Sequence, residues 1–136
     1  MDYVLDKESR GRWIVVRFRG GVTLEGLRDL AADLREQSLF APDQPRLFDW
    51  NAAMLADLEP TDAVPLLLDT QPDAAGGPEP HGIIAHVCAD PLKRILLKYW
   101  VAAAGSRYGL DTELFLSLDQ AHAWLELRTS QLSRSA

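Results

Sequence analysis

Apolar positions recur along this chain with two different spacings, and the first of them is typical of strands. Residues 3–6 and 13–19 form two apolar segments joined by a short turn that contains a glycine. In the second segment Ile14, Val16 and Phe18 alternate with other residues, and a period of two indicates a half-buried strand. Two such strands on either side of a short turn predict a β-hairpin.

The second spacing is helical, and it returns several times after the hairpin. Thr23 can cap one helix, a second is predicted to start at Thr61 or Asp62, and a capping box at residues 117–120 starts the last. Asp90 followed by Pro91 is the clearest helix start in the chain. The apolar face predicted for the helix after Thr23 consists of Leu24, Leu27, Ala31 and Leu34. The face predicted for the helix after Asp90 consists of Leu92, Ile95, Leu96, Tyr99, Ala102 and Ala103.

Short apolar segments between these helices predict three more strands, at residues 46–50, 82–88 and 112–116. Residues 82–88 are almost continuously apolar, as in a central strand that is buried on both faces. Residues 51–58 fit a loop or a helical turn, and residues 72–80, rich in proline and glycine, predict a mobile loop. The element order ββαβαβαβα predicts an α/β fold, a mixed sheet of four or five strands flanked by about four helices.

Composition indicates a single domain at residues 1–128 with a polar C-terminal tail at residues 129–136. The chain has 136 residues, of which 47% are hydrophobic and 25% charged, a balance that suits one ordinary core. Its formal net charge of -6 disfavours nucleic acid as a partner. The single cysteine, Cys88, rules out a disulfide within the chain. Without a signal-peptide pattern or an apolar run of about 20 residues, we expect a cytoplasmic protein with no membrane span.

Four segments, taken together with the order of the elements, point to a known family. They are residues 16–23 (VRFRGGVT), 47–50 (LFDW), 83–87 (IIAHV) and 114–125 (LFLSLDQAHAWL). This set resembles the SpoIIAA-like (STAS-type) family of small bacterial proteins, over residues 3 to about 127. The resemblance implies a four- or five-stranded sheet flanked by helices, and a binding or regulatory role without catalysis.

The resemblance also singles out Asp49. In the anti-sigma-factor antagonists of this family, a phosphorylatable serine follows an aspartate at the end of the third strand. Asp49 takes the place of that aspartate, but the next four residues are Trp50, Asn51, Ala52 and Ala53. None of them carries a hydroxyl group, so we expect no phosphoswitch at this position.

Asp49, Trp50 and Asn51 lie where the third strand is predicted to end. Ligands of open α/β sheets favour crevices at such strand ends, so these three residues are a candidate contact surface. The alternative is structural, with Asp49 capping the next turn and Trp50 covering the edge of the sheet.

His86, Cys88 and Asp90 are spaced so that a strand would direct all three to one face. That spacing is compatible with metal or thiol chemistry. However, Asp90 is already explained as an N-cap, His86 as a core histidine and Cys88 as a small buried hydrophobe. We therefore predict no metal, no cofactor and no catalytic residue, and we keep Cys88 and Asp90 only as part of the contact surface.

The helix after Asp90 is basic, although the protein is acidic. Residues 91–110 include Lys93, Arg94, Lys98 and Arg107 and no acidic residue. Such residues can form a solvated face whose C-terminal cations suit the helix dipole. Alternatively, Lys93, Arg94 and Lys98 dock the domain to an acidic protein partner or to the acidic face of a second copy.

Three functions compete at this point. The first is a non-enzymatic binding or regulatory module of SpoIIAA-like type that acts through protein contacts. The second is a carrier or sensor of a small apolar molecule or lipid, suggested by Phe48, Trp50 and Trp100; it requires a concave apolar pocket. The third is an enzyme that uses Asp49, Cys88 and Asp90, and it requires these side chains to converge on one point.

Overall fold

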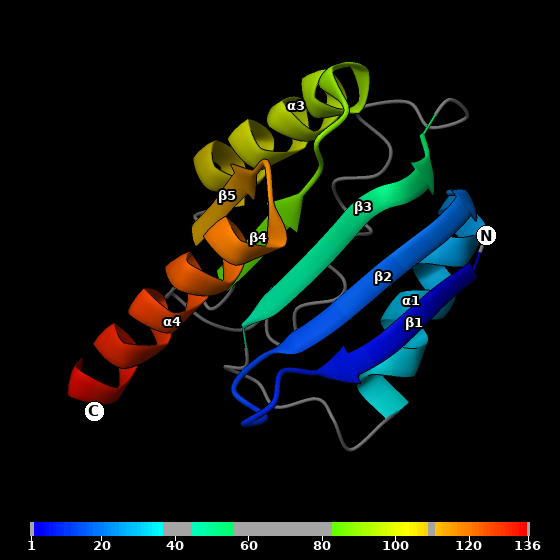
Figure 1. Ribbon diagram of the computed structural model, residues 1–136. Helices are drawn as coiled ribbons and strands as arrows, with labels where there is room; N and C mark the ends of the chain where they lie inside the picture. The colour runs from blue at the N-terminus through cyan, green and yellow to red at the C-terminus, as the bar shows by residue number, and fades with distance from the viewer. Residues whose placement is uncertain (1, 37–44, 56–82, 109–110, 136) are drawn as a thin grey trace.

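The computed structural model describes residues 2–36, 45–55, 83–108 and 111–135. Within them five strands form one sheet in the order β1-β2-β3-β4-β5 (Figure 1). β1 (Asp2–Lys7) pairs antiparallel with β2 (Ile14–Gly21), while β3 (Arg46–Met54), β4 (Ile83–Val87) and β5 (Asp111–Phe115) continue the sheet in parallel. The predicted mixed sheet with an N-terminal hairpin is therefore confirmed.

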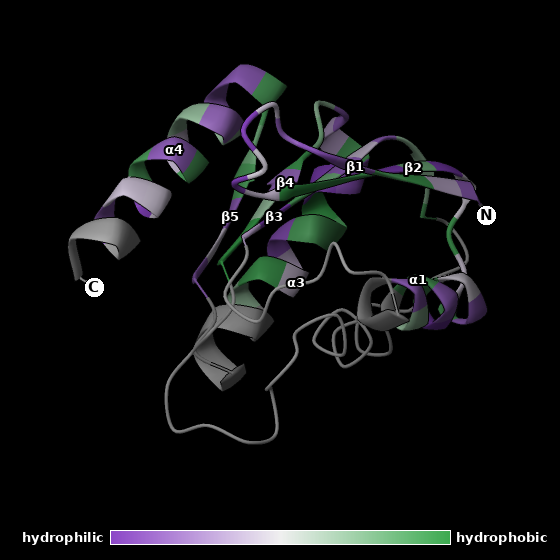
Figure 2. Cartoon of the chain, turned by 90° about the horizontal axis from the view of Figure 1, so that it is seen from below, coloured by the Kyte–Doolittle hydropathy of each residue, from purple (hydrophilic) through white to green (hydrophobic). Residues whose placement is uncertain are grey.

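Helices cover the two faces of the sheet unequally. α1 (Leu24–Glu36) and α3 (Pro91–Tyr108) lie on one face, and α4 (Leu118–Ser135) lies on the other (Figure 2). The segment that was expected to be a polar tail continues α4 as far as Ser135. None of the helices in the described ranges is long and apolar enough to cross a membrane.

The main core lies between the sheet and the α1–α3 layer. It is built around aromatic rings from three neighbouring elements, with Phe18 stacked on Trp50 at a centroid distance of 4.1 Å and Trp50 edge-on to Trp100 at 5.6 Å. A smaller core under α4 contains Trp13, Ala121 and Leu125. Because β2 contributes to both cores, Ile14, Val15 and Val16 are all buried, and only the second half of this strand is half-buried as predicted.

β3 is longer than the sequence predicted. It was expected to end at Trp50, but it continues to Met54, so residues 51–54 form neither a loop nor a helical turn. A register shift between Arg17 and Arg19 of β2 allows this continuation, because Arg17 pairs with Asp49 and Arg19 pairs with Ala52. The predictions of a helix from residue 61 and of a mobile loop at 72–80 fall outside the described residues.

α3 is rotated about its axis relative to the prediction. The face expected to be buried carries Leu92 and Ile95, which are 78% and 68% exposed, and Tyr99, which is 40% exposed. The main core contacts come instead from Leu97 and Trp100, which are almost completely buried, and Leu96 is the one member of the predicted face, among the described side chains, that packs against this core. The sheet thus selects a face of α3 that the spacing of small and aliphatic residues did not single out.

Candidate functional site

The start of α3 is positioned by the end of β4. After Val87 the chain turns at Cys88–Asp90, and the Leu92 amide donates a hydrogen bond to Asp90 Oδ1 at 2.9 Å. The Asp90 carbonyl oxygen accepts the first bond within the helix from the Arg94 amide at 3.0 Å. Asp90 is therefore an N-cap, as its place before Pro91 predicted.

Asn51 connects β3 to this turn. Its Oδ1 atom accepts a hydrogen bond from the Ala89 amide, and its carbonyl oxygen accepts one from Lys93 Nζ, each at 3.0 Å. The backbone N–H of Asn51 donates in turn to Asp49 Oδ1 at 3.0 Å. Asp49 and Asn51 from the predicted strand end and Lys93 from the basic helix are thus joined in one chain of hydrogen bonds.

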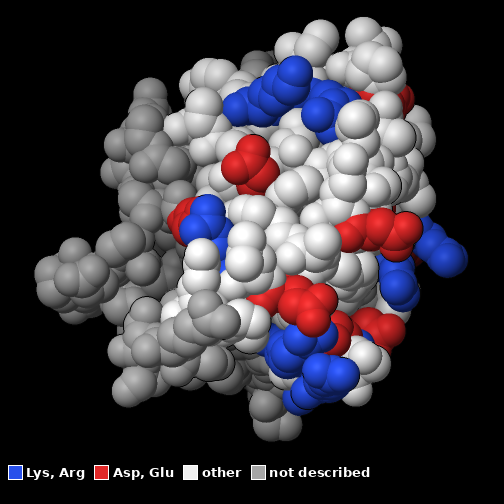
Figure 3. All heavy atoms as spheres, turned by 60° about the vertical axis from the view of Figure 1, so that its left-hand side comes forward, with Lys and Arg blue, Asp and Glu red and all other residues white. Residues whose placement is uncertain are grey.

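Arg94 is held in the same region. Its Nη1 atom donates to the carbonyl oxygen of Cys88 at 2.9 Å, which fixes the guanidinium against the β4–α3 turn. Lys98 follows one turn later on the exposed side of the helix. Figure 3 shows Lys and Arg side chains gathered at the top of the molecule, the end at which Figure 1 places the start of α3.

Trp50 and Cys88 are corrections to the predicted contact surface. Both side chains are fully buried, so neither can meet a partner. Trp50 points into the core because alternate residues of a strand face opposite sides, and its Nε1 atom donates to His86 Nδ1 at 2.9 Å. His86 is a core histidine whose pKa is lowered by burial from 6.5 to about 3.

The arrangement required by the enzyme hypothesis is not found. Cys88 belongs to the core under α1 and α3, whereas Asp49 alternates with the buried Phe48 and Trp50 and so faces the opposite side of the sheet. The Asp90 carboxylate is engaged in capping α3. In the described parts of the chain, no three His, Cys, Asp or Glu side chains are grouped to hold a metal ion.

The surface at this end of the molecule contains apolar residues that sequence reasoning missed as contact residues. Met54 at the end of β3 is 63% exposed and lies beside the exposed side chain of Leu92. Together with Leu55, Lys93 and Leu96 they line an open groove of about 370 Å³. The sequence offered no signal for Met54, since residues 51–58 fitted a loop or helical turn, and it predicted Leu92 in the core.

We call this region the α3 surface and define it by its exposed apolar residues and its cations. The members are Asn51, Met54, Leu92, Lys93, Arg94, Ile95, Lys98 and Tyr99. By contrast, the aromatic residues that suggested a carrier of apolar molecules, Phe48, Trp50 and Trp100, are packed in the core.

Comparisons with known proteins identify the fold. No family model matches the chain, and no curated protein matches it either. Among solved structures, it is similar to an uncharacterised protein of the DUF3478 family from Shewanella loihica PV-4, which has a SpoIIAA-like fold. The two share 14% sequence identity with a TM-score of 0.58, over 91% of this chain and 92% of the other. The resemblance inferred from the sequence is thereby confirmed at the level of architecture: the protein has a SpoIIAA-like fold.

Proposed function

We propose that this protein is a non-enzymatic binding module whose α3 surface docks an acidic, amphipathic segment of a protein partner. The observation that carries the proposal is the pairing of exposed apolar side chains with cations on one helix. Four of the seven large hydrophobic residues exposed in the described chain, Met54, Leu92, Ile95 and Tyr99, lie here rather than being scattered. Contiguous exposed apolar surface with a charged rim is typical of protein interaction sites.

The charges of this surface define the partner. Residues 91–108 carry four cations and no acid, on a chain whose net charge is -6. Lys93 and Arg94 are anchored to backbone carbonyl oxygens, so less side-chain entropy is lost when they contact an acidic group. Opposite charge on the partner would raise the association rate and select against other basic surfaces.

The module is proposed to act without chemistry of its own. His86 and Cys88, two groups that could in principle transfer a proton or act as a nucleophile, are buried under α3. The family serine is absent after Asp49, so regulation by phosphate at that position is not part of the proposal. A protein partner is favoured over a small apolar ligand because the groove at Met54 is open and the aromatic residues are already packed.

Affinity capture from a cell extract, compared between matched variants, tests the proposal. Ile95→Ser removes an exposed apolar side chain from the α3 surface, and Leu127→Ser removes one of similar exposure, 57%, from α4. We expect one partner to be captured by the unchanged protein and by Leu127→Ser, and to be lost with Ile95→Ser. A partner retained equally by both variants contradicts the proposal.

Charge and self-association are tested with the same material. Lys98→Glu should weaken capture, whereas Arg28→Glu, an exposed change on α1, should leave it unchanged. Binding to the isolated partner should also weaken as salt is raised. The rival occupant of the α3 surface is a second copy of this chain, and native mass spectrometry tests for it. A dimer that the substitution Ile95→Ser dissociates would contradict the acidic partner and assign the surface to self-association.

A further inference from the structure

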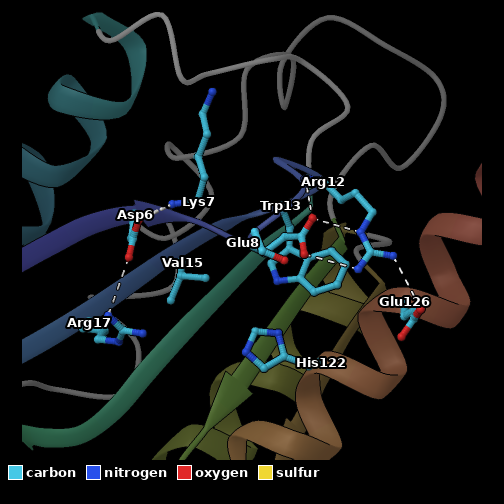
Figure 4. A pocket seen from close by; sticks show the side chains of 10 residues that line it. Asp6, Lys7, Glu8, Arg12, Trp13, Val15, Arg17, His122 and Glu126 are labelled. Carbon is cyan, nitrogen blue, oxygen red and sulfur yellow. Dashed lines mark hydrogen bonds and ion pairs between the residues drawn. The ribbon is translucent and has the colours of Figure 1, made fainter.

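A second hollow lies at the opposite end of the sheet from the α3 surface, between the β1–β2 hairpin and α4. Its volume is about 410 Å³. Most of its lining residues are charged or polar, among them Asp6, Arg17, His122 and Glu126, while Trp13 and Val15 are its apolar members (Figure 4). We call it the hairpin pocket; the docking proposed for α3 makes no use of it.

β2 and the residue just before it contribute three of the lining residues of this pocket. Trp13, Val15 and Arg17 point to the same side because alternate residues of a strand do so. Val15 is buried and lies between the other two, and α4 adds His122, whose ring centroid is 5.6 Å from that of Trp13. Figure 4 shows Arg17 on one side of the pocket and the Trp13 and His122 rings on the other.

Two hydrogen-bond donors of the pocket are poorly matched with acceptors. The side chain of Arg17 is 51% exposed, and the contact found for it is with Asp6, at 3.8 Å between Nη1 and Oδ2. That separation exceeds the ~2.7–2.9 Å of a charge-assisted hydrogen bond. The indole N–H of Trp13 is buried and has no acceptor, an arrangement that is costly inside a protein.

The acidic residues nearby are already occupied. Glu8 accepts hydrogen bonds from the amides of Arg10 and Arg12 and from the Arg12 guanidinium, and these contacts hold its pKa at about 2. Glu126 pairs with the same guanidinium at 3.6 Å. Arg12 thus satisfies the two glutamates, while Arg17 keeps most of its donors for a ligand.

We propose that the hairpin pocket binds a small organic carboxylate, with its carboxylate group on Arg17 and its apolar body on Val15 beside the Trp13 and His122 rings. A guanidinium matches a carboxylate in a two-bond geometry that a point charge cannot reproduce. At ~3.3 Å per residue, Trp13 and Arg17 are about 13 Å apart along the strand, which leaves room for a molecule with one ring. Small-molecule sites are concave and combine apolar surface with polar groups that fix the orientation of the ligand, and Val15 and Arg17 supply these two elements here.

Asp6 makes the sign of the ligand charge testable. Its carboxylate competes with an anionic ligand for Arg17, whereas it would help to hold a cationic one. Removing this charge in Asp6→Asn should therefore tighten the binding of a carboxylate. The expected gain is about threefold to tenfold, because one negative charge close to an exposed binding site is removed. A weaker affinity in Asp6→Asn would mean that the pocket prefers cations, and would overturn the proposal.

Titration of the full chain with benzoate, followed by proton–nitrogen NMR, is the primary experiment. We expect saturable shifts of the Trp13 indole N–H and of the Arg17 Nε–H signals. Benzamide, which has the same ring without the charge, and inorganic phosphate, which has charge without the ring, should produce no such shifts at the same concentration. Equal response to benzamide or to phosphate, or no saturable shift at millimolar benzoate, overturns the proposal.

A matched pair of arginine variants completes the test. Arg17→Ala should weaken benzoate binding at least about tenfold, because it removes the charged fork that recognises the carboxylate. Arg19→Ala changes a similarly exposed arginine of β2 that does not line the pocket, and should leave the affinity unchanged. Both positions are exposed, so the spectra of both variants should remain those of a folded protein. Equal affinity in the two variants overturns the assignment to Arg17.

Discussion

α1 and α3 lie on the same face of the sheet, yet only one of them follows its sequence pattern. In α1 Leu24 and Leu27 of the predicted stripe pack against the core beside the buried Leu30, while Arg28 and Asp29 are exposed. In α3 Leu92, Ile95 and Tyr99 of the predicted stripe point outward, and the core contacts are made by Leu97 and Trp100 with the half-buried Leu96. α1 has a single apolar face, whereas α3 has apolar residues on two. The second apolar face is therefore available for a partner, which is the basis of the proposed function.

The largest expected effect compares the two faces of α3 directly. Leu97→Ala should lower the free energy of unfolding by about 2–5 kcal/mol, because it removes a fully buried side chain and leaves a cavity. Ile95→Ala, at an exposed position, should change it by no more than about 0.5 kcal/mol. Urea unfolding of both variants measures the difference. Similar losses at the two positions would contradict the inward orientation of Leu97 and the outward orientation of Ile95.

The core beneath α3 should also make stability depend on pH. The pKa of His86 is about 3 in the folded protein and 6.5 as an ordinary value, so the unfolded chain binds more protons between these limits. Stability due to neutral His86 is complete above pH 6.5 and is lost as the pH falls, by up to about 1.4 kcal/mol per pH unit. Between pH 7 and pH 5 the free energy of unfolding should therefore fall by roughly 2 kcal/mol at most. Glu8 stays ionised in the folded protein over this interval, and the loss is measured by unfolding the protein at both pH values.

His86→Gln keeps an acceptor near Trp50 Nε1 but cannot titrate, so its stability should vary less across this interval. His122→Asn provides the control, since His122 lies on α4 beside Trp13 and outside the core of α3. An unchanged pH dependence in His86→Gln would show that other groups cause it.

The smallest effect compares how the two helices begin. Thr23 Oγ1 accepts a hydrogen bond from the Gly26 amide at 3.0 Å, and Asp90 Oδ1 accepts one from the Leu92 amide at 2.9 Å. Replacing either residue by alanine should cost about 1 kcal/mol, as for N-caps generally. If Asp90→Ala costs much less than Thr23→Ala in thermal unfolding, α3 is held by its packing on the sheet and not by its cap.

Much of the candidate site was within reach of the sequence, but its surface was not. Asp90 as a cap follows from the Asp90–Pro91 pair, and the sequence also singles out Asn51, Lys93 and Arg94. In the structure Asn51 contacts Ala89 and Lys93, and Arg94 contacts Cys88. Trp50 and Cys88 were misjudged because exposure depends on which side of a strand meets a helix layer. Met54 was missed because the continuation of β3 depends on its pairing with β2 across a register shift.

By itself the sequence determined the order of the elements in the described ranges, the hairpin, the starts of α1, α3 and α4 and the buried character of β4, because these follow from local periodicity and capping. Only the tertiary structure decided which face of α3 is buried, how far β3 extends and that Trp13, Arg17 and His122 share a pocket. These features arise from contacts between residues distant in the chain. Hydrophobic burial is not directional, so a helix with two apolar faces acquires its inner face only from the sheet on which it packs.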